Sequence, residues 1–366
     1  MILIHSNYHP DNIGGIESVV KQLMQIAHNQ GEAVEVVCAG DSSQSFAHAF
    51  GMIYTRRTIK NLFGAPIISF GNIFFTWRGV KADLIIYQEP FPTLWPAIIF
   101  LNYILKKNII VLHHADPAAN SKIKYLYKRF RSFVFRNCIS VSTSPELENQ
   151  VKSPYHAKSV VIPLGIERDY KLNLNISDIS ELIPIRYCLF VGRLAEYKGI
   201  PYLLDAIHLL PSINFIIAGS GPYSDFVEEF LREKQVSNLI FINQFISEAE
   251  KLTLIENCQI LLFPSVSENE AFGIIQLEAM RQRKPIINTF LDNGVNYVAP
   301  NGVCSVSVEK CNSKSLANAI DILWHDECLR LKLGEMGKNR FLDLFTVDHF
   351  TCSWTQLINF MLEDDT

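Results

Sequence analysis

The sequence predicts an α/β fold with two domains, each built on a parallel sheet that helices cover. Its 366 residues are enough for two domains of ordinary size. Short runs rich in β-branched residues recur in both halves, and the segments between them are long enough for helices. Parallel strands buried on both faces form such continuous apolar runs, and parallel neighbours need long connections. In the first half the runs are Ile2–His5, Ala33–Cys38, Leu84–Tyr87, Ile109–Leu112, Ile139–Ser142 and Val160–Ile162. In the second half they are Tyr187–Val191, Ile213–Ala218, Leu239–Ile242, Ile260–Phe263 and Pro285–Asn288.

A polar segment between the two series of strands, Asp169–Ser180, is the expected linker between the domains. We therefore expect an N-terminal domain over residues 1–168 and a C-terminal domain over residues 169–345. A last helix within residues 346–366 is expected to return to the N-terminal domain. The predicted architecture is two Rossmann-like domains with parallel sheets facing across a cleft. Ligands of open parallel sheets bind beyond the carboxyl ends of the strands, so the functional motifs are expected there.

Charge is divided unevenly between the two halves of the chain. The net charge is −4, yet residues 1–167 contain 16 Lys and Arg against 11 Asp and Glu, and the remainder contains 17 against 26. Two stretches of the first half have no acidic residue: Ser42–Ala82 with five basic residues and Pro117–Pro145 with six. Such asymmetry indicates two domains with different partners, and the basic domain is expected to face an anionic partner.

Composition is typical of a soluble protein with well-filled cores, since 48% of the residues are apolar and 19% are charged. The eight cysteines are scattered without a Cys-x-x-Cys pair, which predicts buried free thiols in a reducing compartment. The N-terminus MILIHSNYHP is interpreted as a first strand rather than a signal peptide. The segment most similar to a membrane span, Phe91–Leu105, contains two prolines and is predicted to be a buried or interfacial helix.

Residues 121–137, SKIKYLYKRFRSFVFRN, interleave six basic residues with five aromatic ones. One interpretation is a helix that lies on an anionic membrane, with Lys124, Lys128 and Arg131 facing the headgroups. The other is an ordinary amphipathic helix packed on the sheet, and the sequence leaves both open. Nucleic-acid binding is disfavoured, because no recognition motif accompanies these residues.

A first motif, VGRLAEYKG at residues 191–199, follows a strand and precedes a predicted helix that begins near Pro201. Arg193 and Lys198 stand five residues apart on this loop, so both cations can converge on one anion. The helix N-terminus adds its dipole and free N–H groups. The competing interpretation is two solvated surface charges.

A second motif, PSVSENEAFGIIQLEAM at residues 264–280, also follows a strand. Glu270 falls at a predicted helix entrance and Glu278 lies about a turn and a half inside the helix. The first could merely cap the helix and the second could merely be a surface residue. Glu278 is surrounded in sequence by apolar residues, however, where an unpaired carboxylate would be costly, and this favours a ligand as its partner.

Together these motifs resemble the signature of glycosyltransferase family 4, in which GRLAEYKG is followed by two glutamates eight residues apart. The turn Gly219–Pro222 lies between the two motifs, and the resemblance extends to VIPLGIE at residues 161–167. It continues upstream through three further short matches, GGIE at residues 14–17, EPFP at residues 89–92 and HAD at residues 114–116. The resemblance covers nearly the whole chain. It implies a GT-B fold and a retaining enzyme that uses a sugar-nucleotide donor in bacterial surface-polysaccharide synthesis.

The resemblance also implies a role for each matching residue. Arg193 and Lys198 would hold the donor diphosphate and stabilise the charge that builds on it as the glycosidic bond breaks. Glu270 would accept hydrogen bonds from the donor sugar, and Glu278 from the nucleotide ribose. The remaining expected site residues are the backbone of Phe272, Gly273 and Ile274 at the diphosphate, Gly14 and Gly15 in the N-terminal loop, and His114 near the transferred sugar with Asp116 beside it on the acceptor side.

No cofactor or metal ion is expected. The sequence has no Asp-x-Asp motif after any strand, so Arg193 and Lys198 would supply the positive charge that a divalent ion provides elsewhere. The family retains anomeric configuration, and no carboxylate nucleophile is evident. The resemblance therefore favours attack on the front face of the sugar, with the departing diphosphate helping to take the acceptor's proton.

Two departures from the family pattern concern the second half. Gln244 stands where the family usually has glycine close to the nucleobase, which leaves base recognition open. The segment RQRKP at residues 281–285 replaces a glycine-containing turn.

Three other functions compete with this interpretation. A GT-B enzyme acting on soluble sugars and a non-catalytic sugar- or lipid-binding scaffold both remain possible. A nicotinamide dehydrogenase is disfavoured, because Gly219-Ser220-Gly221 lacks the third glycine of the dinucleotide fingerprint.

The expected partners are a nucleotide-sugar donor, a lipid-linked saccharide acceptor of the O-antigen or capsule type, and an anionic membrane surface. The expected location is the cytoplasm, at the inner face of the cell membrane.

Overall fold

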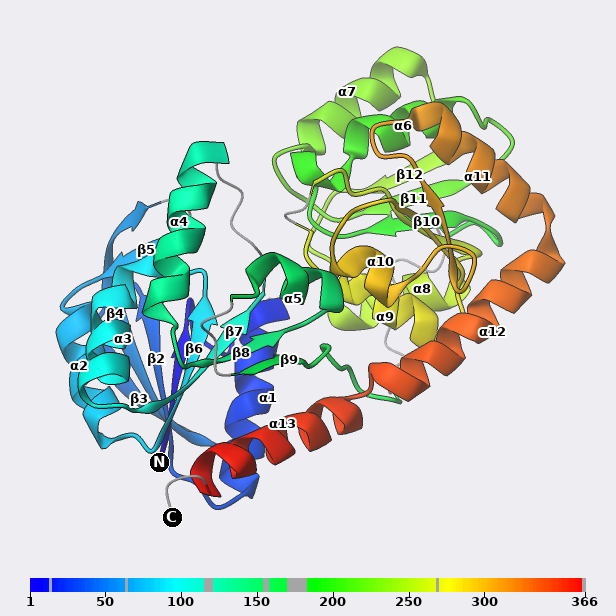
Figure 1. Ribbon diagram of the computed structural model, residues 1–366. Coiled ribbons are helices and arrows are strands. Elements are labelled where there is room, and N and C mark those ends of the chain that lie inside the picture. The colour runs from blue at the N-terminus through cyan, green and yellow to red at the C-terminus, as the bar shows by residue number, and fades with distance from the viewer. Residues whose placement is uncertain are drawn as a thin grey trace. The chain divides into compact units, whose positions relative to one another are not determined.

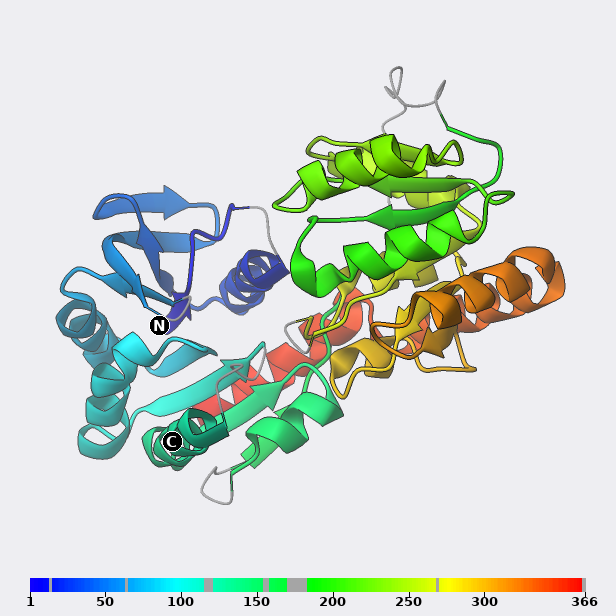
Figure 2. The ribbon, with the colours of Figure 1, turned by 90° about the horizontal axis from the view of Figure 1, so that it is seen from above.

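A computed structural model describes residues 1–12, 15–62, 65–114, 121–153, 158–169, 183–267 and 270–363 (Figures 1 and 2). Within these ranges, the side chains of residues 16, 61–62, 65–66 and 121–126 are not described. The chain divides into two compact units. The first comprises Met1–Leu164 together with Asp348–Thr366, and the second comprises Gly165–Val347.

The first unit is built on one large sheet with the strand order β3-β4-β2-β1-β6-β7-β8-β9, and β5 pairs with β4. Its strands are β1 Ile2–Ser6, β2 Val34–Gly40, β3 Gln44–His48, β4 Gly51–Leu62, β5 Ala65–Ile68, β6 Leu84–Glu89, β7 Asn108–His113, β8 Ile139–Ser142 and β9 Lys158–Val161. All neighbours are parallel except β3 with β4 and β4 with β5. Every predicted strand of this half is present, and the parallel sheet is confirmed for its buried core.

The three strands β3, β4 and β5 form an edge of the sheet that the sequence did not predict. Strand β3 is exposed along nearly its whole length, and most of β4 after Tyr54 is polar. A strand that is buried on neither face gives no continuous apolar run, so a search for such runs misses it.

Helices cover the first sheet. They are α1 Gly15–Asn29, α2 Gly71–Lys81, α4 Ser121–Val134, α5 Pro145–Val151 and α13 Val347–Glu363, with three short helical segments η1 Pro92–Leu94, α3 Trp95–Ile99 and η2 Phe100–Ile104. The last three, a 3₁₀-helix, an α-helix and a π-helix, occupy the segment predicted as a single buried or interfacial helix.

The final helix, α13, packs on the first unit. Trp354 on this helix is fully buried. Asn108 donates a hydrogen bond to the carbonyl of Met361 at 3.0 Å, and Gln30 donates one to the side chain of Asn359 at 2.6 Å. These contacts join the far end of the chain to the start of β7 and the end of α1.

The second unit is built on a six-stranded, fully parallel sheet with the order β12-β11-β10-β13-β14-β15. Its strands are β10 Cys188–Val191, β11 Phe215–Ala218, β12 Leu239–Ile242, β13 Ile260–Phe263, β14 Ile286–Thr289 and β15 Ser305–Val308. Its helices are η3 Glu196–Lys198, α6 Ile200–His208, α7 Ser224–Lys234, α8 Glu248–Asn257, α9 Ile274–Arg281, α10 Gly294–Val298, α11 Ser313–His325 and α12 Glu327–Leu344.

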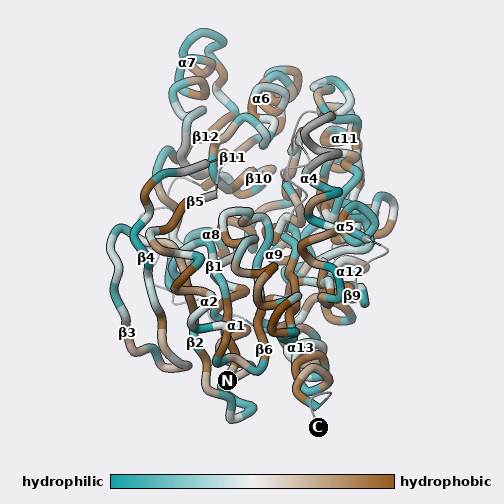
Figure 3. Tube along the Cα trace, turned by 60° about the vertical axis from the view of Figure 1, so that its left-hand side comes forward, coloured by the Kyte–Doolittle hydropathy of each residue, from teal (hydrophilic) through white to brown (hydrophobic). Residues whose placement is uncertain are grey.

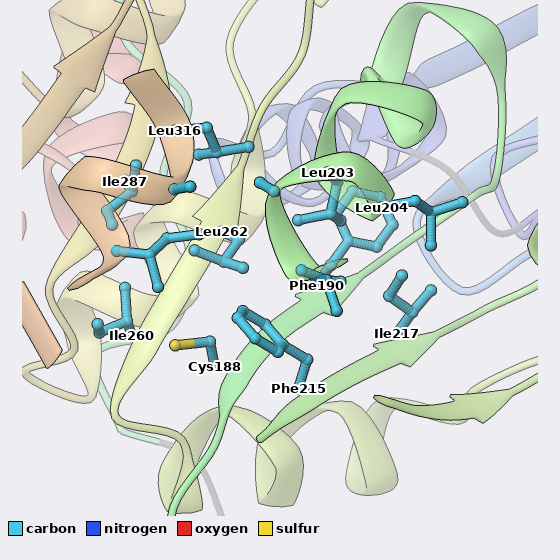
Figure 4. Close-up of a cluster of buried hydrophobic side chains, with 14 of the residues drawn as sticks. Cys188, Phe190, Leu203, Leu204, Phe215, Ile217, Ile260, Leu262, Ile287 and Leu316 are labelled. Atoms are coloured by element: carbon cyan, nitrogen blue, oxygen red, sulfur yellow. The ribbon is translucent and has the colours of Figure 1, made fainter. Parts of the chain in front are cut away.

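The core of the second unit forms where α6 and α11 cover one face of its sheet. Phe190, Phe215 and Leu262 from the strands meet Leu203 from α6 and Leu316 from α11 in a continuous apolar cluster (Figure 4). In both units hydrophobic residues lie along the central strands such as β6, and hydrophilic residues lie along outer helices such as α7 (Figure 3).

Five of the eight cysteines are buried, as the sequence predicted. The other three, Cys311, Cys328 and Cys352, are exposed, and all eight are free thiols.

Candidate active site

The predicted donor motifs lie on two neighbouring loops of the second unit. One loop follows β10 and carries Arg193 and Lys198, and the other follows β13 and carries Glu270. From β10 the chain continues to β11 on one side, and it later returns to β13 on the other side. The direction of strand addition therefore reverses between β10 and β13. Such a switch point is where open parallel sheets bind ligands.

Three glycines hold these loops in close contact. A Cβ atom on Gly199 would lie 2.1 Å from the carbonyl oxygen of Pro264, and one on Gly219 would lie 2.1 Å from that of Gly192. A Cβ atom on Gly221 would lie 2.3 Å from the carbonyl oxygen of Leu194. All three have positive φ values, which glycine adopts without strain.

Backbone hydrogen bonds fix the same loops. Leu194 donates to the carbonyl of Ser220 at 3.0 Å, and Val266 donates to that of Tyr197 at 2.8 Å. The cation-bearing loop is thus fastened on one side to the turn after β11 and on the other to the loop after β13.

Lys198 and Glu270 form an ion pair between the two loops. Their side chains are only 14% and 12% exposed, so the pair is partly withdrawn from water. Arg193, in contrast, is exposed, and its guanidinium has no hydrogen bond or ion pair to a residue that the structure describes. The site therefore presents one available cation beside a second that a carboxylate already neutralises.

Glu270 is supported by residues that the sequence analysis missed. Asn293 donates a hydrogen bond to the backbone carbonyl of Glu270 at 2.7 Å, while its own side-chain oxygen caps α10. Ser265 donates to the carboxylate at 3.3 Å, and Thr289 donates to the carbonyl of Ser265. The position of Asn293 just before a short helix is an N-cap signal, but its contact with Glu270 spans 23 residues and leaves no trace in local sequence.

The helix that carries Glu278, α9, begins directly beside Glu270. Gly273 precedes its first residue, Ile274, with a φ of 77°, and a Cβ atom there would lie 2.7 Å from the ring of Phe263. Phe272 is buried, and its ring packs edge-on against Phe345. The backbone at the start of α9 is therefore anchored on both sides.

Beneath the start of α9 lies a buried polar network. Gln276 donates to the carbonyls of Phe272 and Val295, and Asn288 donates to the side chain of Gln276 at 3.0 Å. Ser307 in turn donates to Asn288. Such satisfied networks favour one unique arrangement, and this one fixes the first turn of α9.

Glu278 forms an ion pair with Lys251 on α8 at 2.7 Å. The sequence predicted a ligand as its partner, and the structure pairs one oxygen, Oε1, with a lysine of the protein. The other carboxylate oxygen, Oε2, is buried without a hydrogen-bond partner in the described structure. Burial raises the pKa of Glu278, and the charge of Lys251 opposes that rise. Lys251 also pairs with the exposed Glu248 at 2.7 Å.

The remaining predicted residues of the active site belong to the first unit. His114 follows β7 directly, is 8% exposed and has no partner for Nε2 within the described structure. Burial lowers the pKa of His114 to about 4, so its imidazole is neutral at physiological pH. Gly15 is the first residue of α1. Gly14 and Asp116 lie outside the described residues.

Helix α4 corrects one part of the membrane prediction. Arg131 is only 3% exposed and faces the protein interior, where its charge acts on the buried carboxyl of Glu89. Trp95 and Tyr127 donate hydrogen bonds to the same carboxyl, both at 2.9 Å. The prediction that Arg131 faces lipid headgroups is therefore wrong.

The other two cations of that prediction are Lys128 and Lys124. Lys128 donates to the carbonyl of Gln150 at 3.1 Å, so its ammonium is partly satisfied by the protein. The side chain of Lys124 lies outside the described residues. The spacing of basic residues along an amphipathic helix does not by itself show which of them, such as Arg131 on α4, is buried.

No group of three or more His, Cys, Asp or Glu side chains in the part of the chain that the structure describes is arranged to hold a metal ion. Among the helices described, none has the length and apolar character needed to cross a bilayer.

Two family models match the chain. The model described as glycosyl transferases group 1 matches residues 185–340, and that described as glycosyltransferase family 4 matches residues 13–170. The first covers all the donor motifs of the second unit, and the second covers most of the first unit.

Individual proteins are similar over nearly the full length. The O-antigen chain mannosyltransferase C of Escherichia coli is 28% identical, and the match covers 98% of both chains. The D-rhamnosyltransferase WbpZ of Pseudomonas aeruginosa is 25% identical over 93% of this chain and 91% of its own. Among solved structures, Anabaena HepE in complex with UDP and glucose superposes with a TM-score of 0.73 at 18% identity, covering 98% of this chain and 99% of that one.

The two Rossmann-like units, the motifs on their loops and these matches agree. The chain belongs to the group 1/family 4 glycosyltransferases of GT-B fold.

Proposed function

We propose that this glycosyltransferase moves a hexose from a nucleotide-diphosphate donor to a growing, lipid-linked surface oligosaccharide of the O-antigen or capsule type, with retention of configuration. The observation that carries the proposal is the pair of glycine-fastened loops at the switch point of the second sheet. There, Arg193 is exposed beside the Lys198–Glu270 ion pair. The mannosyl- and rhamnosyltransferases similar to this chain support the choice of a hexose and of a polysaccharide acceptor.

In this proposal the second unit binds the donor. The diphosphate contacts Arg193 and Lys198, and the backbone N–H groups at the start of α9 add to the positive field. Lys198 then exchanges its partner Glu270 for phosphate oxygens, which frees the carboxylate to accept hydrogen bonds from the sugar hydroxyls. Because the loops are already fixed, little reorganisation is needed as charge develops on the leaving group. The UDP and glucose bound to HepE are consistent with a donor of this class.

Glu278 is proposed to bind the nucleotide ribose. Its Oε2 atom is buried and has no partner in the described structure, which is costly unless a ligand supplies a donor group. Ribose hydroxyls are donors of this kind. Lys251 would hold the other oxygen and keep the carboxyl ionised.

The first unit is proposed to bind the acceptor. His114 is neutral and its Nε2 has no described partner, so it can exchange hydrogen bonds with an uncharged sugar hydroxyl without introducing a charge. We further propose front-face attack by the acceptor hydroxyl, with the departing diphosphate accepting its proton. Peripheral association with the inner face of the cell membrane would bring the enzyme to a lipid-linked acceptor.

The test is transfer and donor hydrolysis by variants of the loop cations. Arg193→Ala and Lys198→Ala should each lower turnover by roughly 10²-fold or more, since each removes a contact that strengthens in the transition state. Glu270→Ala should do similar damage. Lys332→Ala, which removes an exposed cation on α12, is the matched control and should leave turnover unchanged. Near-normal activity of either cation variant would contradict the diphosphate assignment.

The donor itself can be identified by thermal shift with GDP-, UDP- and dTDP-sugars. A donor at a hundred times its dissociation constant adds about 2.7 kcal/mol to the free energy of unfolding. If a donor binds but neither hydrolysis nor transfer is detected, the chain is a sugar-binding scaffold instead.

A further inference from the structure

An apolar surface on the first unit is not explained by the fold or by the donor site. Helix α2 buries Gly71, Phe75 and Gly79 against the rest of the first unit, yet its opposite side is also apolar. Ile73 is 71% exposed and Trp77, one turn later, is 51% exposed. A helix with apolar residues on both sides normally has a partner on both sides.

A second apolar row lies beside the first. Phe100 and Ile104, one turn apart on η2, are 41% and 67% exposed. Trp77 and Phe100 line the same shallow groove, together with Pro96 and Ala97 from α3. Ile73 lines this groove as well, and Ile104 lies one turn beyond Phe100 on η2. We call the surface of Ile73, Trp77, Phe100 and Ile104 the α2–η2 face.

The α2–η2 face is held rigidly. A Cβ atom on Gly79 would lie 2.6 Å from the side chain of Leu101, so α2 and η2 approach each other as closely as glycine allows. At the other end of α2, Asn72 donates to the carbonyl of Thr93 at 2.9 Å and accepts a hydrogen bond from the backbone of Ala97 at 3.2 Å. Exposure of the apolar side chains is thus a property of the folded unit.

The segments that form this face contain basic residues and no acidic ones. No Asp or Glu occurs in residues 42–82 or 90–115, which contain α2, α3 and η2. Lys81 lies over the ring of Trp77, with Nζ 4.8 Å from its centroid, and Lys106 follows η2 and is exposed. Of the acids that border these stretches, Asp83 pairs with the N-terminal amino group at 2.6 Å, and the buried carboxyl of Glu89 accepts hydrogen bonds from Trp95 and Tyr127. Glu35 pairs with Arg78 on α2.

We propose that the α2–η2 face binds the surface of a membrane that contains anionic lipids, with its aromatic and aliphatic side chains inserted at the level of the headgroups. An exposed aromatic and aliphatic surface with a cationic border fits the interfacial zone of a bilayer. A second copy of the chain fits less well. A second copy would bring the same cationic segments to the interface, and the segments that form this face contain no acid to pair with them.

This proposal rests on the proposed function, because a lipid-linked acceptor is the reason for the protein to approach a bilayer. It also moves the membrane contact away from α4, where Arg131 is buried.

The test is co-sedimentation of the full chain with vesicles of phosphatidylcholine alone or mixed with phosphatidylglycerol. Wild-type protein should bind the mixed vesicles well and the neutral ones weakly. Trp77→Ser combined with Ile104→Ser should lower the partition coefficient more than tenfold at both low and high salt. Lys81→Ser combined with Lys106→Ser should lower it about fivefold per lysine at low salt and far less at high salt.

The matched control is Leu331→Ser combined with Phe226→Ser on the second unit, where both side chains are also exposed. It should bind vesicles like the wild type. Lipids brominated on the acyl chain should quench the tryptophan fluorescence of the wild type on binding, and Trp77→Phe should lose most of that quenching. Donor hydrolysis should be unchanged in all of these variants, which shows that they fold and separates this proposal from the donor-site assignment.

Equal vesicle binding by the Trp77/Ile104 variant and the wild type would overturn the proposal, as would failure of the wild type to bind either vesicle. Self-association in sedimentation velocity that the same variant abolishes would assign the face to a second copy of the chain instead.

Discussion

Replacing Lys251 with methionine should impair donor binding through Glu278 rather than through catalysis. Lys251 pairs with the carboxylate of Glu278, whose side chain is 7% exposed, and with Glu248, whose side chain is 69% exposed. Only the first of these pairs is withdrawn from water. Methionine keeps the length and the apolar part of the side chain, so the variant removes the charge with little loss of packing.

The magnitude follows from the burial of Glu278. Removing one partner of a buried ion pair costs about 3–5 kcal/mol, whereas an exposed pair such as that with Glu248 contributes at most about 1 kcal/mol. Glu278 can avoid part of this cost by taking up a proton. At pH 7.5, protonation would cost a glutamic acid with the ordinary pKa of 4.5 about 4 kcal/mol. Burial has already raised the pKa of Glu278, so the cost is smaller, and the free energy of unfolding should fall by less than about 4 kcal/mol.

The effect on the donor has a characteristic pH dependence. In the proposed site the ribose binds the ionised carboxyl, so donor affinity falls as pH decreases through the pKa of Glu278. Loss of Lys251 removes the charge that opposes the raised pKa, and the fall should therefore move to higher pH. At pH 6.5 the donor KM should rise roughly 10- to 100-fold with little change in kcat, and the difference from wild type should narrow towards pH 9.

The assay is the pH profile of donor KM for the wild type, Lys251→Met, Lys251→Arg and Glu248→Gln. Arginine should restore most of the affinity, and Glu248→Gln should behave like the wild type because it leaves the Lys251–Glu278 pair intact. A rise in KM that is the same at every pH would indicate a purely structural defect and refute the reasoning. So would an unchanged KM in Lys251→Met.

Three further outcomes follow from the structure and the sequence. Gly199→Ala should lower turnover more than tenfold, because the new Cβ atom would meet the carbonyl of Pro264 and displace the loop that carries Lys198. As a control, Gly302→Ala is also at positive φ but has open space around it, and it should only slightly reduce the midpoint of thermal unfolding. Chelation with EDTA should leave transfer intact, since cationic side chains are proposed at the diphosphate, and activity that magnesium or manganese restores after chelation would contradict this. Burial lowers the pKa of His5 to about 3, so this histidine takes up a proton in the unfolded chain before it does so in the folded protein as the pH falls. The contribution of His5 to the free energy of unfolding should be fully present above pH 6.5 and decrease below it by about 1.4 kcal/mol per pH unit. Urea titrations between pH 7.5 and 5 should show that His5→Phe removes this part of the decrease.

Sequence alone predicted the parts of the fold in which burial is uniform. Strands such as β1 and β10 are buried at every residue, so their apolar runs are unmistakable. Strand β3 is exposed along its length, and its pairing with β4 depends on a hairpin with no apolar run to mark it. Parallel central strands were therefore predicted and the antiparallel edge was not.

The candidate site shows the same division between local and distant information. Arg193, Lys198 and Glu270 were found because each lies in a motif directly after a strand. The ion pairs of the site, however, join residues that are distant in sequence. Lys198 contacts Glu270 across 72 residues, and Lys251 contacts Glu278 across 27. The apolar neighbours of Glu278 correctly predicted that its carboxyl is buried, but they could not reveal that a lysine on another helix supplies the charge.

The return of α13 to the first unit has a consequence for protein synthesis. The ribosome completes residues 1–164 early, yet the helix that buries Trp354 against them is made only after the roughly 180 residues of the second unit. At about 5–20 residues per second, this interval lasts roughly 10–40 s. During that time the apolar surface that α13 later covers remains without its partner, while the second unit can fold as soon as its own residues emerge. We expect nascent chains stalled before residue 348 to recruit chaperones to the first unit, and chaperone release to follow translation of the last helix.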